Sequence, residues 1–325
     1  MNYEFTLESF DSIYPYWKEI QHNSPVSSIF SSPEWSKVWW QQFGSGAKIW
    51  LGVVRYQGRA IGIAPFLVRN NVASFIGSSD VCDYLDCIVE PSNEEASFRV
   101  LLENLVTEKV LQLDLAPLRP DSTVITSLTN MAQELGWHVS CSSEDVSVEL
   151  DLPTTWEEYL QMLTGKQRHE LKRKLRRMSE EGELNHRINT DANRQDIDIF
   201  LELFRNSRQD KAAFLTPEIE SFFRAATDTM AKQGLLKLNI LELNSSPVAA
   251  TMCFDYKDTV YLYNSGYDPG YGWLSVGLIS KALCIKESID RGRRRFDFLK
   301  GGEAYKYHLG GHELPLYRCQ LKYAG

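Results

Sequence analysis

The sequence predicts an α/β fold, built on mixed sheets and divided into two similar lobes in tandem. Short apolar runs rich in β-branched residues alternate with stretches whose apolar residues recur every three or four positions, which indicates strands between amphipathic helices. Both halves also repeat one order of elements, antiparallel strands followed by a helix and a further strand. A chain of 325 residues allows two domains of about 150 residues each. We therefore expect lobes at residues 1–150 and 151–325, each with a central mixed sheet.

The first half opens with a strand at residues 3–7 and a helix that runs through Trp17. In the next helix, within "SSPEWSKVWWQQFG", Ser32 is suited to the N-cap and Pro33 to the first helical position. Apolar runs broken at "QG" and "NN" indicate a meander over residues 49–77. The remaining elements expected in this half are a strand at 83–91, a helix at 93–106, a strand at 111–118, a helix at 122–137 and paired strands at 138–153.

The second half starts with two helices, of which the second, "GKQRHELKRKLRRMSEEG", is densely basic. Further on, three strands joined by turns at "NSSP" and "KD" precede a long apolar helix and another strand. The elements expected in this half are helices at 155–163 and 165–182, a strand at 184–190, helices at 193–214 and 216–234, strands at 235–243, 246–256 and 259–267, a helix at 273–292, a strand at 294–299 and a terminal strand at 314–324.

Composition excludes several classes of function. A net charge of −8 argues against a general binder of nucleic acid, DNA included. No apolar run reaches the ~20 residues of a membrane helix, and the first residues lack a signal-peptide pattern, so we expect a cytoplasmic protein without a membrane span. Cys82 and Cys87 lack the spacing of a zinc knuckle. Because the other cysteines stand alone in the sequence, we expect reduced thiols and no metal; they are Cys141, Cys253, Cys284 and Cys319.

Several motifs in a fixed order carry a resemblance to a known family. The second half contains "GYDPGY" at residues 266–271, "LSVG" at 274–277 and "FDFLKGGEAYK" at 296–306, and the first half contains "PEWSKVWWQQFG" and "DYLD". With these motifs the chain resembles the CelD-like GNAT acetyltransferases of bacterial polysaccharide biosynthesis. That family is similar in turn to the Fem-type peptidoglycan transferases, which have tandem GNAT halves. The resemblance covers most of the chain and is patchy in the first half.

This resemblance implies an acyltransferase that moves an acyl group directly from acyl-CoA, such as acetyl-CoA, to an amino or hydroxyl group. The implied acceptor is a sugar, a polysaccharide precursor or another cell-envelope precursor. A degenerate lobe would occupy residues 1–150 and the acyltransferase lobe residues 151–325. Two alternatives stay open. The donor is an aminoacyl-tRNA, as in Fem-type transferases, or the protein is a non-catalytic accessory of polysaccharide synthesis, since the family's usual pyrophosphate loop is absent.

The turn before the long apolar helix is expected to hold the pyrophosphate of the donor. Glycine lets a backbone approach a ligand closely, and a helix N-terminus offers free N–H groups to an anion. The expected donor-binding residues are Gly270, Gly272, Ser275, Val276 and Gly277. The alternative interpretation is that these glycines only form a tight turn.

The stretch "GGEAYK" is expected to carry the chemistry. Lys306 follows a strand and two glycines, where an ammonium would stabilise the oxyanion of a tetrahedral intermediate; an ordinary solvated lysine is the alternative. Tyr305 and Glu303 are candidates for proton transfer, and His308 is a weaker one. Asp297, in the preceding strand, is either an acid of the site or a buried structural carboxylate.

The acceptor substrate is expected to contact residues of the family-like motifs, namely Asp83, Tyr84, Tyr267 and Asp268. For the first two, a structural capping role is the alternative. The basic helix at 165–182 is either a solvated face or a surface that meets the phosphates of CoA, a nucleotide-sugar, an anionic lipid or tRNA.

Overall fold

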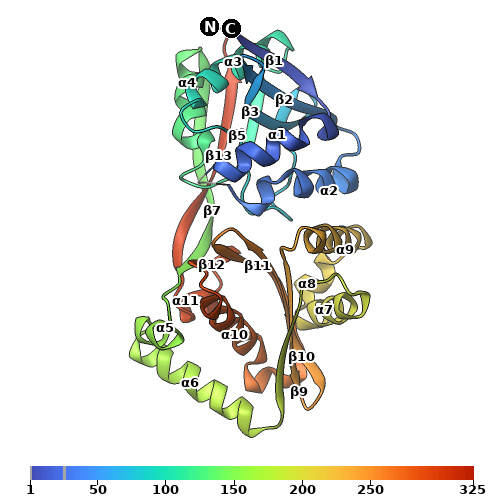
Figure 1. Ribbon diagram of the computed structural model, residues 1–325, viewed down its shortest axis with the longest axis vertical. Helices are drawn as coiled ribbons and strands as arrows, with labels where there is room; N and C mark the ends of the chain where they lie inside the picture. Colours follow the sequence, from blue (N-terminus) through green and yellow to red (C-terminus); the bar gives the residue numbers. More distant parts are fainter. Residues whose placement is uncertain (1, 25–26) are drawn as a thin grey trace. The chain divides into compact units, whose positions relative to one another are not determined.

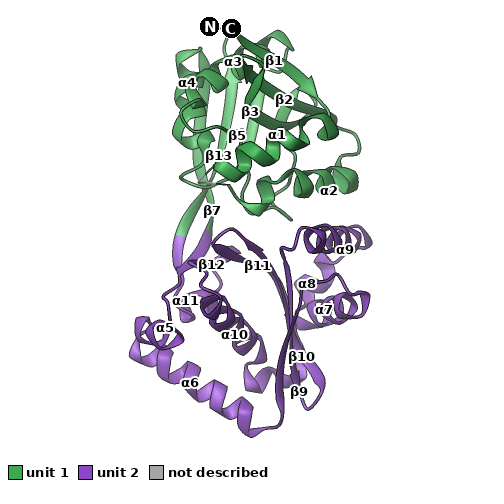
Figure 2. Ribbon diagram, viewed as in Figure 1, with its two compact units in different colours: residues 1–146, 314–325 green, residues 147–313 purple. Residues whose placement is uncertain are grey.

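The computed structural model describes residues 2–24 and 27–325 (Figure 1). The chain divides into two compact units, residues 1–146 with 314–325 and residues 147–313 (Figure 2). The sequence predicts one lobe over residues 151–325, whereas the last strand of the chain belongs to the first unit.

Unit 1 contains a strand, two helices, a strand meander and then alternating helices and strands. Ser32 caps α2 by accepting the N–H of Trp35, and Pro33 occupies the first turn, as the sequence predicts. The elements are β1 (Tyr3–Glu8), α1 (Phe10–Asn23), η1 (Ile29–Ser31), α2 (Pro33–Phe43), β2 (Lys48–Tyr56), β3 (Arg59–Arg69), β4 (Val72–Phe75), β5 (Ile88–Val89), α3 (Glu94–Thr107), β6 (Gln112–Leu118), η2 (Val124–Leu128), α4 (Thr129–Glu134) and β7 (Trp137–Asp151), which continues into unit 2.

Unit 2 repeats this order after two additional helices, which confirms the predicted tandem arrangement. Its elements are α5 (Trp156–Met162), α6 (Gly165–Glu180), β8 (Leu184–Asn189), α7 (Arg194–Ser207), α8 (Gln209–Phe214), α9 (Pro217–Lys232), β9 (Leu236–Leu243), β10 (Ser246–Tyr256), β11 (Thr259–Tyr267), η3 (Pro269–Leu274), α10 (Val276–Asp290), β12 (Arg295–Lys300), α11 (Ala304–His308) and β13 (His312–Tyr323), which ends in unit 1.

The strands pair in one continuous order, β1-β2-β3-β4-β6-β13-β7-β12-β11-β10-β9-β8, with β5 paired to β3. The expectation of a separate sheet in each lobe is therefore wrong. The reason is that the two units exchange strands, β13 and the end of β7. The last strand of the chain, β13, pairs with β6 of unit 1, and the end of β7 pairs with β12 of unit 2. In each unit the third strand of the meander also has a parallel neighbour, β6 for β4 and β12 for β11.

Residues 138–153 were expected to form paired strands, but residues 137–151 form the single strand β7. The polar run in its middle suggested a turn. That run contains neither glycine nor proline, and its side chains are exposed along an extended strand.

A disulfide joins Cys141 of β7 to Cys319 of β13, with the two Cα atoms 4.2 Å apart. The prediction of reduced thiols is therefore wrong for this pair. A separation of 178 residues gave no sign that the two strands are neighbours. The other four cysteines are free and buried, and for Cys253 and Cys284 this agrees with the apolar context seen in the sequence.

Helices cover both faces of strands β9 to β11, with α10 on one face and α7 to α9 on the other (Figure 1). The apolar residues of α10 are buried against the strands, among them Ile279, Ala282 and Ile285. On the other face, α7 packs directly over Gly266 of β11. A Cβ there would come within 2.2 Å of the backbone nitrogen of Phe204, so the close approach requires glycine.

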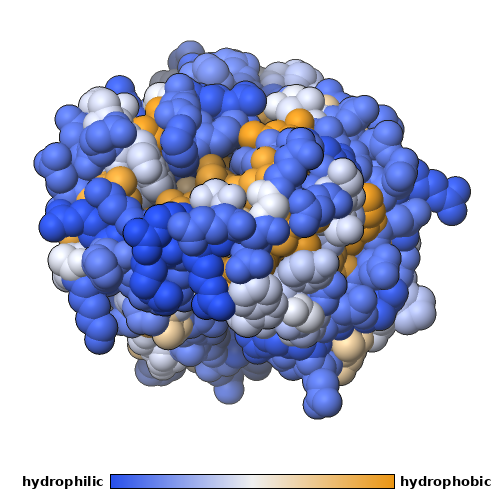
Figure 3. All heavy atoms as spheres, turned by 90° about the horizontal axis from the view of Figure 1, so that it is seen from below, coloured by the Kyte–Doolittle hydropathy of each residue, from blue (hydrophilic) through white to orange (hydrophobic). Residues whose placement is uncertain are grey.

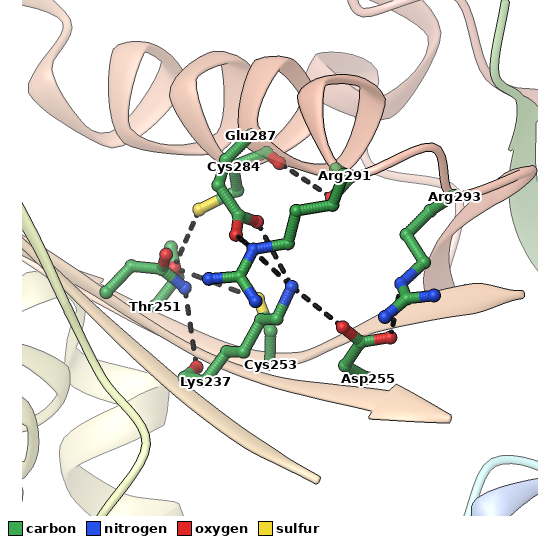
Figure 4. A network of polar contacts seen from close by, with 10 residues as sticks. Lys237, Thr251, Cys253, Asp255, Cys284, Glu287, Arg291 and Arg293 are labelled. Atoms are coloured by element: carbon green, nitrogen blue, oxygen red, sulfur yellow. Dashed lines mark hydrogen bonds and ion pairs between the residues drawn. The ribbon is translucent and has the colours of Figure 1, made fainter. Parts of the chain in front are cut away.

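A buried network of charges fixes the C-terminal half of α10 to β9 and β10 (Figure 4). Lys237 Nζ lies 2.8 Å from a carboxylate oxygen of Asp255 and 3.2 Å from one of Glu287. Arg293 also pairs with Asp255 at 2.8 Å, and Arg291 pairs with Glu287. Because buried charges are costly unless they are paired, this network holds α10 in one position and so fixes where its N-terminus lies.

Candidate active site

The site begins where two parallel strands separate. Strands β11 and β12 pair at only three positions, residues 259–261 with residues 295–297. Beyond them β11 continues to Tyr267 and β12 to Lys300, and a bulge in the pairing of β10 with β11 lies at the same level. The two strands are thus free to diverge toward their C-terminal ends, which opens the sheet beside α10.

A cavity of about 420 Å³ lies at this opening. Five segments of unit 2 line it, α6, the start of α8, the end of β11, the turn from η3 into α10, and α11. The lining residues are Lys174, Arg208, Lys211, Ser265, Tyr267, Gly272, Ser275, Val276, Gly277, Leu278, Lys281, Glu303, Tyr305 and His308. Figure 3 views the molecule from the end that carries α6. Hydrophilic residues cover most of that face, with apolar residues visible in the recesses between them.

The N-terminus of α10 opens into the cavity. Ser275 precedes the helix in the left-handed conformation (φ 60°, ψ 37°) and provides no side-chain cap. Among the described residues, no hydrogen-bond partner is found for the backbone N–H groups of Val276 and Gly277, both of which line the cavity. A Cβ at Gly277 would lie 3.1 Å from the ring of Tyr267, so a larger residue there requires a small shift of that ring. Free amides at a helix N-terminus favour an anion.

Positive charge predominates in the lining, with Lys174, Arg208, Lys211 and Lys281 against the one carboxylate of Glu303. Lys174 Nζ donates to Ser275 Oγ at 3.0 Å, which ties α6 to the start of α10. Lys211 donates to the carbonyl of Ser265, and burial, followed by repulsion from Arg208, lowers its pKa to about 8. The cavity is therefore suited to a polyanionic ligand.

Lys281 is the most deeply placed of these cations, with 6% of its surface exposed. Its Nζ donates to the carbonyl oxygen of Gly277 at 2.9 Å and lies 4.8 Å from the ring centroid of Tyr305. Burial, and next the charge of Lys211, lower the pKa of Lys281 to about 7. Near neutral pH this amine is consequently able to accept a proton, as a catalytic base must.

Tyr305 and Glu303, two of the predicted catalytic residues, do line the cavity. Burial, and next the charge of Glu303, raise the pKa of Tyr305, so its phenol stays protonated and can act as an acid. Burial alone would raise the pKa of Glu303, but the charge and hydrogen bond of Lys306, together with a backbone hydrogen bond and the charge of Arg208, lower that pKa overall. Glu303 is thus an ionised counter-ion of Lys306, 2.9 Å away, which is a poor fit to the predicted proton transfer.

The predicted oxyanion role of Lys306 is contradicted by its surroundings. The side chain is buried, and Nζ donates to the backbone carbonyls of Leu299, Lys300 and Gly301 at 2.9, 2.7 and 2.8 Å. An ammonium has three donors, so none is left for an oxyanion. Lys306 instead holds the turn between β12 and α11 in place, and it is not among the residues that line the cavity.

Asp297, Gly270 and Asp268 also prove to be structural rather than part of the cavity. Asp297 is buried, and its carboxylate accepts the N–H of Leu299 at 2.7 Å. Asp268 accepts the N–H of Gly270 at 2.8 Å and so caps η3, which leaves that amide unable to bind a donor. The other predicted donor residues do line the cavity, as does Tyr267; they are Gly272, Ser275, Val276 and Gly277.

Asp83 and Tyr84, predicted to bind the acceptor, belong to unit 1 and line no part of this cavity. Tyr84 is buried against Phe30, with the guanidinium of Arg119 4.9 Å from its ring centroid. These contacts make Tyr84 a packing residue and contradict a direct role in binding substrate.

The basic helix α6 has two distinct kinds of cation. Arg173 forms two hydrogen bonds with Glu170 on the same helix, at 2.9 and 2.8 Å, and is exposed. Lys174 enters the cavity, and the guanidinium of Arg177 lies 4.8 Å from the ring centroid of Trp273 beside it. The helix is therefore partly a solvated surface and partly a wall of the site.

Sequence reasoning missed Lys281, Lys211 and Arg208 as site residues. Lys281 did carry a signal, because it is a lone lysine in the apolar run "VGLISKALCI" that the structure buries. Arg208 and Lys211 lie in an ordinary polar stretch, and they reach the cavity because α7 packs on β11 and carries α8 with it. Among the described residues, no group of three His, Cys, Asp or Glu is arranged to hold a metal, and no helix is long and apolar enough to cross a membrane.

Known proteins resemble this chain in the sequence of one segment and in fold. Residues 165–307 match the family described as "Acetyltransferase (GNAT) domain". No protein of curated function matches the sequence. Similar solved structures include FemX, with a TM-score of 0.68, 11% identity and coverage of 97% of this chain and 96% of that one. A tandem GNAT protein from the clavulanic acid biosynthesis pathway has a TM-score of 0.52 and 12% identity, with 98% of each chain covered.

A third similar structure is the C-terminal domain of a putative lysylphosphatidylglycerol synthetase from Agrobacterium fabrum. It has a TM-score of 0.59 and 9% identity, with 96% of this chain and 92% of that chain covered. At these identities the structures show a shared fold, and the family match covers the segment that forms the cavity from α6 to α11. Residues 165–307 therefore form an acetyltransferase (GNAT) domain, and the protein is an acyltransferase.

Proposed function

We propose that the protein transfers an acyl group from acyl-CoA, such as acetyl-CoA, to an amino group of a sugar or polysaccharide precursor. The observation that carries this proposal is the cavity of unit 2. It combines four cations with the amides of Val276 and Gly277, for which the described part of the chain offers no partner, at the point where β11 and β12 diverge. A pyrophosphate fits the cationic helix terminus, and a thioester arm fits the opening between the strands.

The chain's own residues supply both proton transfers that direct acyl transfer needs. The acceptor amine attacks the thioester carbonyl, so that a C–N bond forms and the C–S bond breaks. Neutral Lys281 takes the proton from the amine, and the phenol of Tyr305 gives a proton to the departing thiolate. After product leaves, Lys281 gives up its extra proton and the phenolate of Tyr305 regains one, so that both residues return to their starting states. No acyl-enzyme intermediate is required.

The sugar acceptor rests on the resemblance to CelD-like enzymes. A second candidate function is transfer from aminoacyl-tRNA, as in Fem-type transferases. It is favoured by the exposed cations on α6 outside the cavity, such as Lys166, Lys172 and Arg176, which would suit a nucleic-acid backbone.

The test separates binding from turnover. Thermal unfolding is followed with acetyl-CoA, with an amino-sugar nucleotide and with aminoacyl-tRNA, because a ligand that binds the native state raises the melting temperature. Release of free thiol from acetyl-CoA is then measured with amino sugars and with their hydroxyl analogues. We expect stabilisation by acetyl-CoA and thiol release that depends on the amino group. Stabilisation by aminoacyl-tRNA alone would favour the second candidate and contradict the first.

A further inference from the structure

Trp273 is unusual among the large side chains of unit 2, because 52% of its surface is exposed. It lies in η3, directly before α10. The guanidinium of Arg177, on α6, is 4.8 Å from the centroid of the indole ring. A cation over an aromatic ring at this distance is attracted to it, so Arg177 holds the indole while about half of its surface remains in contact with solvent.

The indole lies at the rim of the cavity described above. Gly272 and Ser275, which flank residues 273 and 274, both line the cavity. On α6, Lys174 precedes Arg177 by three positions and so lies on the same face of the helix. Lys174 donates to Ser275 Oγ, while Arg177 contacts Trp273. One helix face thus borders both the phosphate-binding end of the cavity and the exposed indole.

We propose that Trp273 and Arg177 form a stacking platform for the purine base of the acyl donor. This inference rests on the proposed function, and it adds the part of the site that recognises the nucleotide. A flat indole stacks on the face of a base, and a planar guanidinium can stabilise the stack while it also bonds a nearby phosphate. A phosphate at the start of α10 would bring an attached nucleoside within reach of residue 273.

The order of groups along the site favours CoA as the source of the purine. Trp273 precedes α10, the free amides lie in the first turn at residues 276 and 277, and Lys281 lies about 7.5 Å further along the helix than Val276. Base, phosphates and reacting acyl group would therefore follow one another in that order. In CoA the pantetheine arm separates nucleotide from acyl group, whereas in aminoacyl-tRNA the acyl group is attached to the terminal adenosine itself.

A comparison of ligands with and without the nucleotide tests the platform. Affinities for CoA and for pantetheine are measured by calorimetry on the wild type, on Trp273→Leu and on a control variant, Met162→Ala. Met162 is as exposed as Trp273, at 56%, but does not line the cavity. We expect Trp273→Leu to weaken CoA binding by about 5- to 150-fold, as loss of one stacked base would. Pantetheine affinity should not change, and Met162→Ala should bind both as the wild type does.

Equal CoA affinity in the wild type and Trp273→Leu would overturn the proposal, as would an equal loss for CoA and pantetheine. Adenosine 3′,5′-bisphosphate provides a probe that needs no acyl transfer. Its quenching of Trp273 fluorescence, obtained as the difference between wild type and variant, supports the platform even if acetyl-CoA proves not to be a substrate. If Trp273→Leu weakened binding of the trinucleotide CCA but left the affinity for CoA unchanged, CoA would not be the source of the purine base.

Discussion

Unit 1 and unit 2 follow the same order of elements, yet they differ at the N-terminus of the helix after the meander. In both units that helix, α3 or α10, leads to a strand parallel to the last strand of the meander. In unit 2 the adjoining space is a cavity of about 420 Å³. In unit 1 the space between α3 and its strands is about 10 Å³. Beside this helix, unit 2 thus has an open cavity and unit 1 a tightly packed contact.

The two helix starts also differ in charge. The first turn of α3 carries Glu94 and Glu95, which offset the positive end of the helix dipole. The first turn of α10 carries no acidic residue and is surrounded by cations. A phosphate would be repelled at the first helix and attracted at the second. This contrast supports the proposal that the first lobe is degenerate and that donor binding belongs to unit 2.

The largest effect is expected from Lys281→Met, which removes the base proposed for unit 2. Turnover should fall by about 100- to 10,000-fold, the usual contribution of general acid–base catalysis. In the wild type, kcat/KM should decline as pH falls below about 7, because the amine must be neutral to accept a proton and its pKa is lowered to about 7. The variant should lack this decline.

Lys286→Met is the matched control, since Lys286 lies on the same helix in an exposed pair with Asp290 at 2.8 Å. It should keep both the rate and the pH profile. A decline near pH 7 that survives in Lys281→Met and disappears in His308→Gln would assign the base to His308, which also lines the cavity.

Lys306→Met should reduce stability rather than chemistry. Loss of the ammonium leaves three backbone carbonyls and Glu303 without their partner. Breaking a buried, hydrogen-bonded charge typically costs about 3–5 kcal/mol. We expect a loss of this order in the free energy of unfolding, measured with denaturant. Lys172→Met, on the exposed face of α6, should change it little. A variant with normal stability and slow turnover would restore the oxyanion role.

The order of elements could be predicted well because it depends on local patterns, and four of the five residues proposed to bind the donor do line the cavity of unit 2. The start of α10 was found from the glycines and the motif "LSVG". The roles of single side chains were predicted less well. Lys306 is the lysine that follows the glycine pair, but whether a lysine meets a ligand or its own backbone depends on the path of the turn around it. The exchange of β7 and β13, and with it the disulfide, depends on partners far apart in the chain.

Leu278→Glu would give α10 the kind of first turn that α3 has. Leu278 lines the cavity, so a carboxylate at this position would face the donor phosphates. Because both groups are negatively charged, they would repel each other. We expect CoA affinity to fall at least about tenfold by calorimetry. Leu278→Gln has nearly the same shape without the charge and should lose much less. Glu95→Gln, the reverse change in unit 1, should leave CoA affinity unchanged. An equal loss in the Glu and Gln variants would show that shape, not charge, distinguishes the two helices.

The smallest effects are expected from adding one methyl group at a matched glycine in each unit. At Gly277 the new Cβ would lie 3.1 Å from the ring of Tyr267, which borders the open cavity and can shift into it. At Gly62 the Cβ would lie 2.9 Å from Ser97 Oγ, on a buried face of α3 with almost no free space.

Gly277→Ala should therefore weaken CoA binding a few-fold with little change in stability. Gly62→Ala should destabilise the fold by about 1–3 kcal/mol, the usual cost of overpacking, with CoA affinity unchanged. A loss of CoA affinity in Gly62→Ala at full stability would mean that unit 1 also takes part in donor binding, and the contrast between the two units would fail.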